Sequence, residues 1–134
     1  MRVRVLNEKN KYYLPKEEYL TALHFALQYG NWVAELRTAP DTSKAITYDA
    51  DKVQTSGGYD PNAEMAMRRY TLSKKRDLVD EVLHQVAPEI EEYLRLGVCY
   101  GFTFWQLKGR GMPCEKDMYY DRRHRFYWEL AKKI

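Results

Sequence analysis

The last third of the chain places a short helical segment, a glycine-containing turn and one long basic helix in succession. Residues 103–108 have a helical pattern, residues 109–113 read Gly-Arg-Gly-Met-Pro, and no glycine or proline follows from residue 114 to residue 134. Glycine and proline this close together end a helix, so the stretch separates two helices. The layout is typical of a helix-turn-helix, whose second helix enters the major groove of DNA.

The preceding residues also have helical periodicity. Apolar side chains at helical spacing predict a long helix over residues 16–37, with Gly30 tolerated or marking a bend, and a second over residues 61–87 that could break near residues 71–73. Asp60 is a candidate N-cap, Pro88 opens a further helix, and Gly101 closes it. Thr103 caps the short helix that follows, and the last helix begins at Cys114. We therefore predict an all-α fold, a small helical bundle with a C-terminal helix-turn-helix. Residues 1–100 would form the helical body and residues 101–134 the DNA-binding segment.

Two segments lack helical periodicity. Residues 2–14 alternate weakly and predict a short hairpin or an arm. Residues 38–60 are rich in Pro, Gly, Ser and Asp, and predict a long exposed loop that either docks its few large apolar side chains or stays mobile.

Composition excludes several classes of protein. The chain has 134 residues, of which 45% are hydrophobic, but it contains no apolar run long enough to span a membrane. Cys99 and Cys114 fit neither a disulfide framework nor a common zinc spacing, so we expect reduced thiols in a cytoplasmic protein without metal or cofactor. Because no glycine-rich phosphate loop or paired catalytic carboxylates are recognisable, we do not expect an enzyme.

Charge is distributed unevenly along the chain. Residues 101–134 carry eight Lys and Arg against four Asp and Glu, whereas residues 77–95 carry six acidic side chains against one arginine. A basic end beside an acidic middle is expected of a module that meets phosphate with one face. Solvated helix faces of varying sign explain this asymmetry equally well.

The turn and the first turns of the last helix contain the candidate DNA contacts. Cations in the turn would bind phosphates, arginine can bind guanine through two hydrogen bonds, and glutamate can accept a hydrogen bond from cytosine. The candidates are Lys108, Arg110, Glu115, Lys116, Tyr119, Tyr120, Arg122 and Arg123. We expect Arg122 at the edge of the core. We also expect Trp105 and Phe126 to be buried against each other or against shared neighbours.

Three motifs carry a resemblance to a known family. They read Gly-Phe-Thr-Phe-Trp-Gln-Leu from residue 101, Met-Pro-Cys-Glu-Lys-Asp from residue 112, and Tyr-Tyr-Asp-Arg-Arg-His-Arg-Phe-Tyr-Trp-Glu-Leu from residue 119. Residues 102–134 thereby resemble the C-terminal half of phage and prophage regulators of the RinA/ArpU type, which are themselves similar to the helix-turn-helix of sigma-factor region 4. The resemblance implies a transcriptional activator of phage genes.

The sequence therefore predicts a regulator of transcription that binds specific double-stranded DNA, with RNA polymerase and a second copy of the chain as further candidate partners. Two alternatives remain open. One is a phage adaptor or inhibitor that binds a host protein through acidic and aromatic surfaces. The other is a small terminase-like subunit that binds DNA as a ring.

Overall fold

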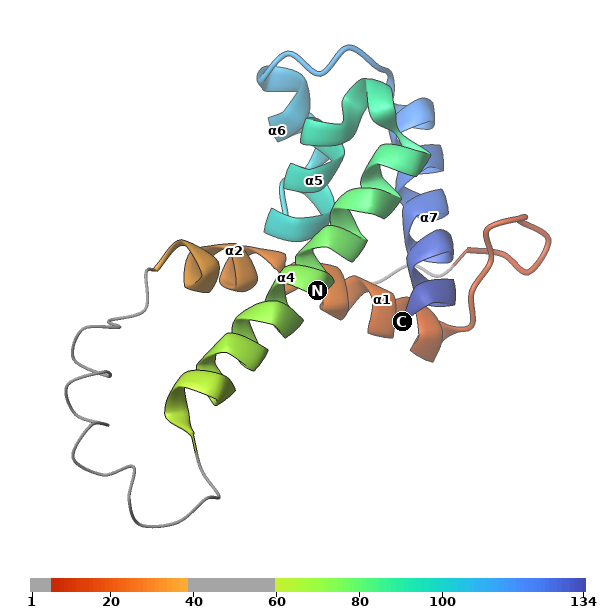
Figure 1. The fold of residues 1–134 in the computed structure, drawn as a ribbon. Helices are drawn as coiled ribbons and strands as arrows, with labels where there is room; N and C mark the ends of the chain where they lie inside the picture. The colour runs from red at the N-terminus through yellow and green to blue at the C-terminus, as the bar shows by residue number, and fades with distance from the viewer. Residues whose placement is uncertain (1–5, 39–59) are drawn as a thin grey trace.

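Every regular element in the described part of the chain is helical. The computed structural model describes residues 6–38 and 60–134 (Figure 1). Its elements are α1 (Lys16–Leu27), α2 (Tyr29–Arg37), α4 (Pro61–Val86), the 3-10 helix η1 (Pro88–Ile90), α5 (Glu91–Tyr100), α6 (Phe104–Gly109) and α7 (Lys116–Lys133). The predicted all-α bundle is confirmed. Nearly all of the predicted loop, residues 39–59, lies outside the described residues, as do residues 1–5 of the predicted arm.

The helix predicted over residues 16–37 is broken at Gln28. The Gln28 amide donates to Phe25 O at 3.2 Å, and Gln28 O accepts from Asn31 N at 3.0 Å, which tightens the backbone between α1 and α2. The bend brings the rings of Phe25 and Trp32 to 5.0 Å. Gly30 lies just beyond the break, and the ring of Tyr100 occupies the space beside it. A bend was therefore anticipated from Gly30, but it begins two residues earlier.

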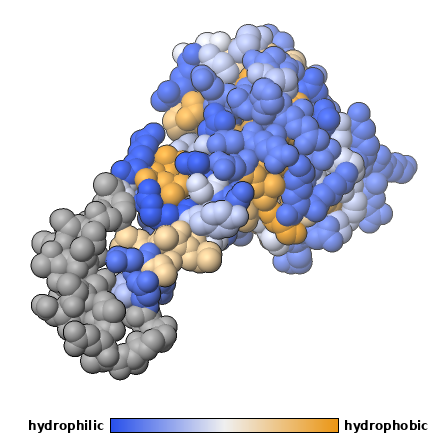
Figure 2. Space-filling view, viewed as in Figure 1, coloured by the Kyte–Doolittle hydropathy of each residue, from blue (hydrophilic) through white to orange (hydrophobic). Residues whose placement is uncertain are grey.

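Helix α4 is one continuous helix of 26 residues, without the break considered near residues 71–73. Asp60 caps its start by accepting a hydrogen bond from Asn62 N at 3.0 Å. The first half is exposed, and Figure 2 shows apolar surface there, where Met65 and Met67 are 39% and 64% exposed. The second half enters the core. Within residues 6–38 and 60–134, no helix is both long and apolar enough to cross a membrane.

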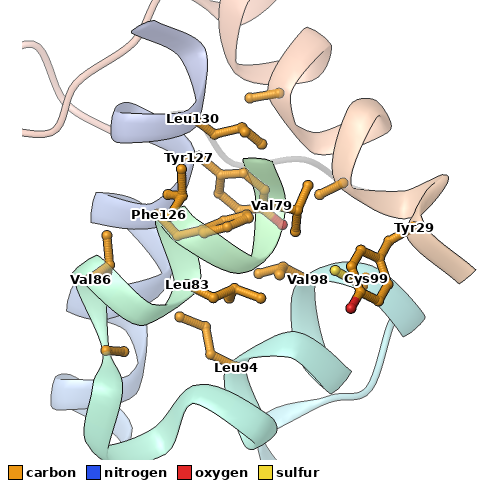
Figure 3. Packing of buried hydrophobic residues seen from close by; sticks show 14 of the residues in the cluster. Tyr29, Val79, Leu83, Val86, Leu94, Val98, Cys99, Phe126, Tyr127 and Leu130 are labelled. Atoms are coloured by element: carbon orange, nitrogen blue, oxygen red, sulfur yellow. The ribbon is translucent and has the colours of Figure 1, made fainter. Parts of the chain in front are cut away.

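A single hydrophobic core includes residues from both predicted segments. Figure 3 shows Phe126, Tyr127 and Leu130 of α7 among Leu83 of α4 and Val98 of α5, and all five are buried. Helix α1 also packs against α7. The core therefore does not divide at residue 100, because α7 supplies some of its largest side chains.

The predicted burial of Trp105 is wrong, whereas that of Phe126 is confirmed. Trp105 is 71% exposed, and the preceding residue, Phe104, is buried with Leu107. Thr103 caps α6, so the first helical residue is Phe104, and this register turns residues 104 and 107 toward the core and residue 105 outward.

The two aromatic residues give a stability test. We expect Phe126→Ala to lower the free energy of unfolding by about 3–5 kcal/mol, because it removes a fully buried ring. The matched variant Trp105→Ala should change it by less than about 0.5 kcal/mol, because its ring is in solvent. Urea denaturation followed by circular dichroism measures both. Equal effects would contradict the packing described for α6 and α7.

Candidate nucleic-acid interface

Helix α6 begins with a complete capping box. Gln106 N donates to Thr103 Oγ1 at 3.2 Å, and Thr103 N donates to Gln106 Oε1 at 2.8 Å. Gly101 ends α5 at a φ of 77°, which a side chain would strain. The predicted cap and the predicted glycine stop are therefore both confirmed, and they leave three residues between the end of α5 and the start of α6.

The glycine turn after α6 forms a Schellman motif. Gly111 has a φ of 97°, its amide donates to Lys108 O at 3.0 Å, and Met112 N donates to Leu107 O at 3.2 Å. Met112 is buried and anchors the turn to the core. Glu115 then has an extended backbone, and α7 begins at Lys116, two residues later than Cys114, the predicted start. The short helix, the glycine turn and the long helix are thus present in the predicted order.

Tyr119 is the point at which α5, α6 and α7 meet. Its hydroxyl lies 2.1 Å from where a Cβ on Gly97 of α5 would stand, and Leu107 of α6 lies 3.5 Å from that same point. The ring centroid is 5.8 Å from that of Phe104. Tyr119 is completely buried, so its predicted role as a DNA contact is wrong. Because the Tyr119 side chain fills this crossing, it has no exposed surface that could contact a base.

Arg122 and Arg123 are engaged in the fold rather than on the outward face of α7. The Arg122 guanidinium lies 3.4 Å from a Glu89 oxygen and 3.0 Å from an Asp121 oxygen, and its Nε is buried without a hydrogen-bond partner in the described residues. Arg122 therefore lies at the edge of the core, as predicted, but it is bound to carboxylates. Arg123 donates to Tyr119 Oη at 3.4 Å and stacks 5.6 Å from the Tyr127 ring centroid. Neither guanidinium is presented to DNA as predicted.

The remaining candidates cluster around the turn. Lys108 Nζ lies 3.6 Å from a Glu115 oxygen and donates to Met112 O at 3.4 Å, so it fastens the turn. Arg110 is exposed and stacks over the ring of Phe102 at 4.7 Å. Lys116 is exposed at the first helical position of α7.

Tyr120 is the last candidate and is only half-buried. It lies one turn after Lys116 on the same edge of α7, and its ring is 6.4 Å from that of Phe104. The structure therefore brings Arg110, Glu115 and Lys116 to one surface beside the turn, with Tyr120 at its border.

We did not predict from the sequence which face of α7 points away from the core. That face carries Asp117, Asp121 and Arg125 at four-residue spacing, and further along Lys132 lies over the ring of Trp128 at 3.1 Å. In the first two turns Asp117 is thus exposed, whereas Asp121 is half-buried and its carboxylate pairs with Arg122 at 3.0 Å. The four-residue spacing was a visible signal, but which face is outward depends on the burial of Tyr119.

Comparisons of the chain with models of known families, with curated proteins and with solved structures give no match. Functional assignment therefore depends on the geometry of the chain itself.

The Gly97–Tyr119 crossing generates a prediction with an internal control. Gly97→Ala should lower the free energy of unfolding by about 1–3 kcal/mol, because Tyr119 is fully buried and cannot swing away from the added methyl group. In a Tyr119→Phe background the nearest ring carbon is 3.3 Å away, so the same substitution should be neutral or stabilise α5 by up to about 1 kcal/mol. Urea denaturation of the four proteins measures this coupling. Additive effects would show that the hydroxyl does not restrict this crossing.

Proposed function

We propose that this chain binds specific double-stranded DNA through the turn between α6 and α7 and the first turns of α7, and so regulates transcription. The observation that carries the proposal is the pair of exposed cations, Arg110 within the glycine turn and Lys116 at the start of the 18-residue helix that follows it. Backbone N–H groups at a helix start and cations beside them are favourable for phosphate.

The way in which α7 is held also supports this proposal. A helix that reads bases must keep its position when it enters the groove. Phe126 and Leu130, in the second half of α7, are fully buried, and Tyr119 fixes the first half against α5 and α6. The turns that would meet DNA therefore extend from a helix anchored along most of its length.

Charge suggests which edge of α7 would face the DNA. Asp117 is exposed and would repel phosphates, whereas Lys116 and Tyr120 occupy the neighbouring edge. We propose that Arg110 and Lys116 contact phosphates, and that Glu115 and Tyr120 lie nearest the bases. Glutamate can accept a hydrogen bond from the amino group of cytosine.

The location and the further partners expected from the sequence are part of this proposal. A regulator of this kind would be cytoplasmic and would act on double-stranded DNA, with RNA polymerase and a second copy of the chain as further partners. The resemblance of residues 102–134 to phage and prophage regulators favours the same function.

A second candidate function is an adaptor that binds another protein. It is favoured by the large exposed side chains of Trp105 and Met67, which are 71% and 64% exposed. Exposed aromatic and methionine side chains are common at protein interfaces. The two proposals differ in salt dependence, because DNA binding releases counterions and weakens steeply with salt.

The DNA proposal is tested by selecting duplexes from a random library and titrating salt on the selected sequence. We expect Lys116→Ala to weaken binding and to reduce the slope of log K against log salt by about 0.9, the contribution of one phosphate contact. Lys74→Ala removes an exposed lysine from α4 and should leave the slope unchanged. Fluorescence anisotropy measures both. Selection that enriches no sequence, or an unchanged slope in Lys116→Ala, would favour the adaptor.

A further inference from the structure

A cleft of about 780 Å³ lies between α7 and the N-terminal half of the chain. One wall is formed by Tyr19, Leu23 and Leu27 of α1 together with the segment before it, and the other by α7. The end of α5 and the start of α6 close the space between them. The volume falls within the range of pockets that bind small molecules, about 300–1,000 Å³.

Basic side chains line this cleft without acidic ones. Lys116, Arg123 and His124 contribute to its wall, and no Asp or Glu does so in the described part of the chain. Arg123 is partly buried, and no carboxylate of residues 6–38 or 60–134 lies within ion-pairing distance of it. Its hydrogen bonds to described residues go to two neutral hydroxyls, that of Tyr119 at 3.4 Å and that of Tyr19. A guanidinium has five N–H donors, so most of the Arg123 donors have no hydrogen-bond acceptor among the described residues.

The neighbours of Arg123 do not neutralise its charge. Burial raises the pKa of the Tyr19 and Tyr127 hydroxyls, so both stay protonated at neutral pH. Burial, followed by the nearby guanidinium of Arg123, lowers the pKa of His124, so its imidazole is neutral there as well. A partly buried cation without a counter-charge is destabilised by desolvation, and a bound anion would remove that penalty.

Most of the rest of the cleft is apolar or aromatic, with Asn7 and Thr103 as polar exceptions. Leu23, Leu27, Val98 and Phe104 line it together with several tyrosine rings. Such walls favour a ligand with an apolar or aromatic body, whereas a free inorganic anion would leave them in contact with water.

From this arrangement, we propose that the cleft binds a small organic anion, an apolar or aromatic body that carries one carboxylate or phosphate. The anionic group binds the Arg123 guanidinium, and Lys116 is a second cation at the mouth. The body packs between Leu23 and Leu27 of α1 and Phe104 of α6. This site is distinct from the proposed DNA-binding surface, because its ligand contacts the inner wall of α7, but the two share Lys116 and Tyr120.

The test uses the full chain without DNA and four probes, namely phenyl phosphate, benzoate, inorganic phosphate and benzyl alcohol. We expect an organic anion, phenyl phosphate or benzoate, to bind at least about tenfold more tightly than inorganic phosphate or benzyl alcohol, since only an organic anion supplies both the charge and the body. Isothermal calorimetry measures affinity, and the NMR signal of the His124 imidazole reports whether the probe is in this cleft. The ratio of benzoate to phenyl phosphate distinguishes a carboxylate site from a phosphate site.

Variants complete the test. Arg123→Met should weaken binding of the preferred anion by about tenfold or more, and the matched change Arg125→Met, on the outward face of the same helix, should not. Leu27→Trp fills the apolar wall without touching Arg123 and should also block binding, which guards against an Arg123 variant that fails to fold. The proposal is overturned if neither organic anion binds at millimolar concentration, if benzyl alcohol or inorganic phosphate binds as well as they do, or if Arg123→Met and Leu27→Trp bind like the unaltered chain.

Discussion

The contact between Tyr119 and Gly97 determines how the C-terminal half of this chain is assembled. The tyrosine hydroxyl occupies the space that any other side chain at residue 97 would need. Because α5 has no side chain there, α7 can approach it closely, and Phe104 and Leu107 of α6 pack around the same crossing. The orientation of α7, and hence the identity of its exposed edge, follows from this one close approach.

The charged side chains at and near α7 fall into two groups, those that pair within the fold and those that remain exposed. Arg122 pairs with Glu89 of η1 at 3.4 Å, and Lys133 lies 3.6 Å from Glu81 of α4, so part of the basic C-terminal charge binds the acidic middle of the same chain. The opposite signs of these two regions are therefore partly an internal complementarity of the fold. Exposed pairs of this kind contribute little stability each, but they remove cations from the surface that DNA could use. What remains beside the turn is Arg110 and Lys116.

Helix caps and helix ends that depend on neighbouring residues could be predicted from the sequence. The Asp60 cap, the Thr103 cap and the Gly101 stop are determined by a few neighbouring residues, and all three were predicted correctly. The break at Gln28 was not, because Gln28 is compatible with a helix, and the ring that packs beside the bend, Tyr100, comes from α5. Trp105 and Tyr119 were assigned to the wrong sides for the same reason. Periodicity shows which residues share a face, but the packing of the helices against one another decides which face is inward.

The candidate site could therefore be located from the sequence but not fully specified. The turn and the start of α7 were correctly identified as neighbours, whereas Arg122, expected at the edge of the core, and Arg123 were both predicted to contact DNA and are bound within the fold. The cleft beneath Arg123 could not be predicted, because its walls come from α1, α5, α6 and α7 and no sequence motif links them.

The central claim is that the turn and the first turns of α7 are the surface that meets DNA. Amide hydrogen exchange of the chain with and without its selected duplex measures this most directly. We expect DNA to slow exchange over residues 110–120 and to leave the exposed first half of α4 unchanged. Protection centred on α4, or no protection over residues 110–120 with the duplex bound, would contradict it.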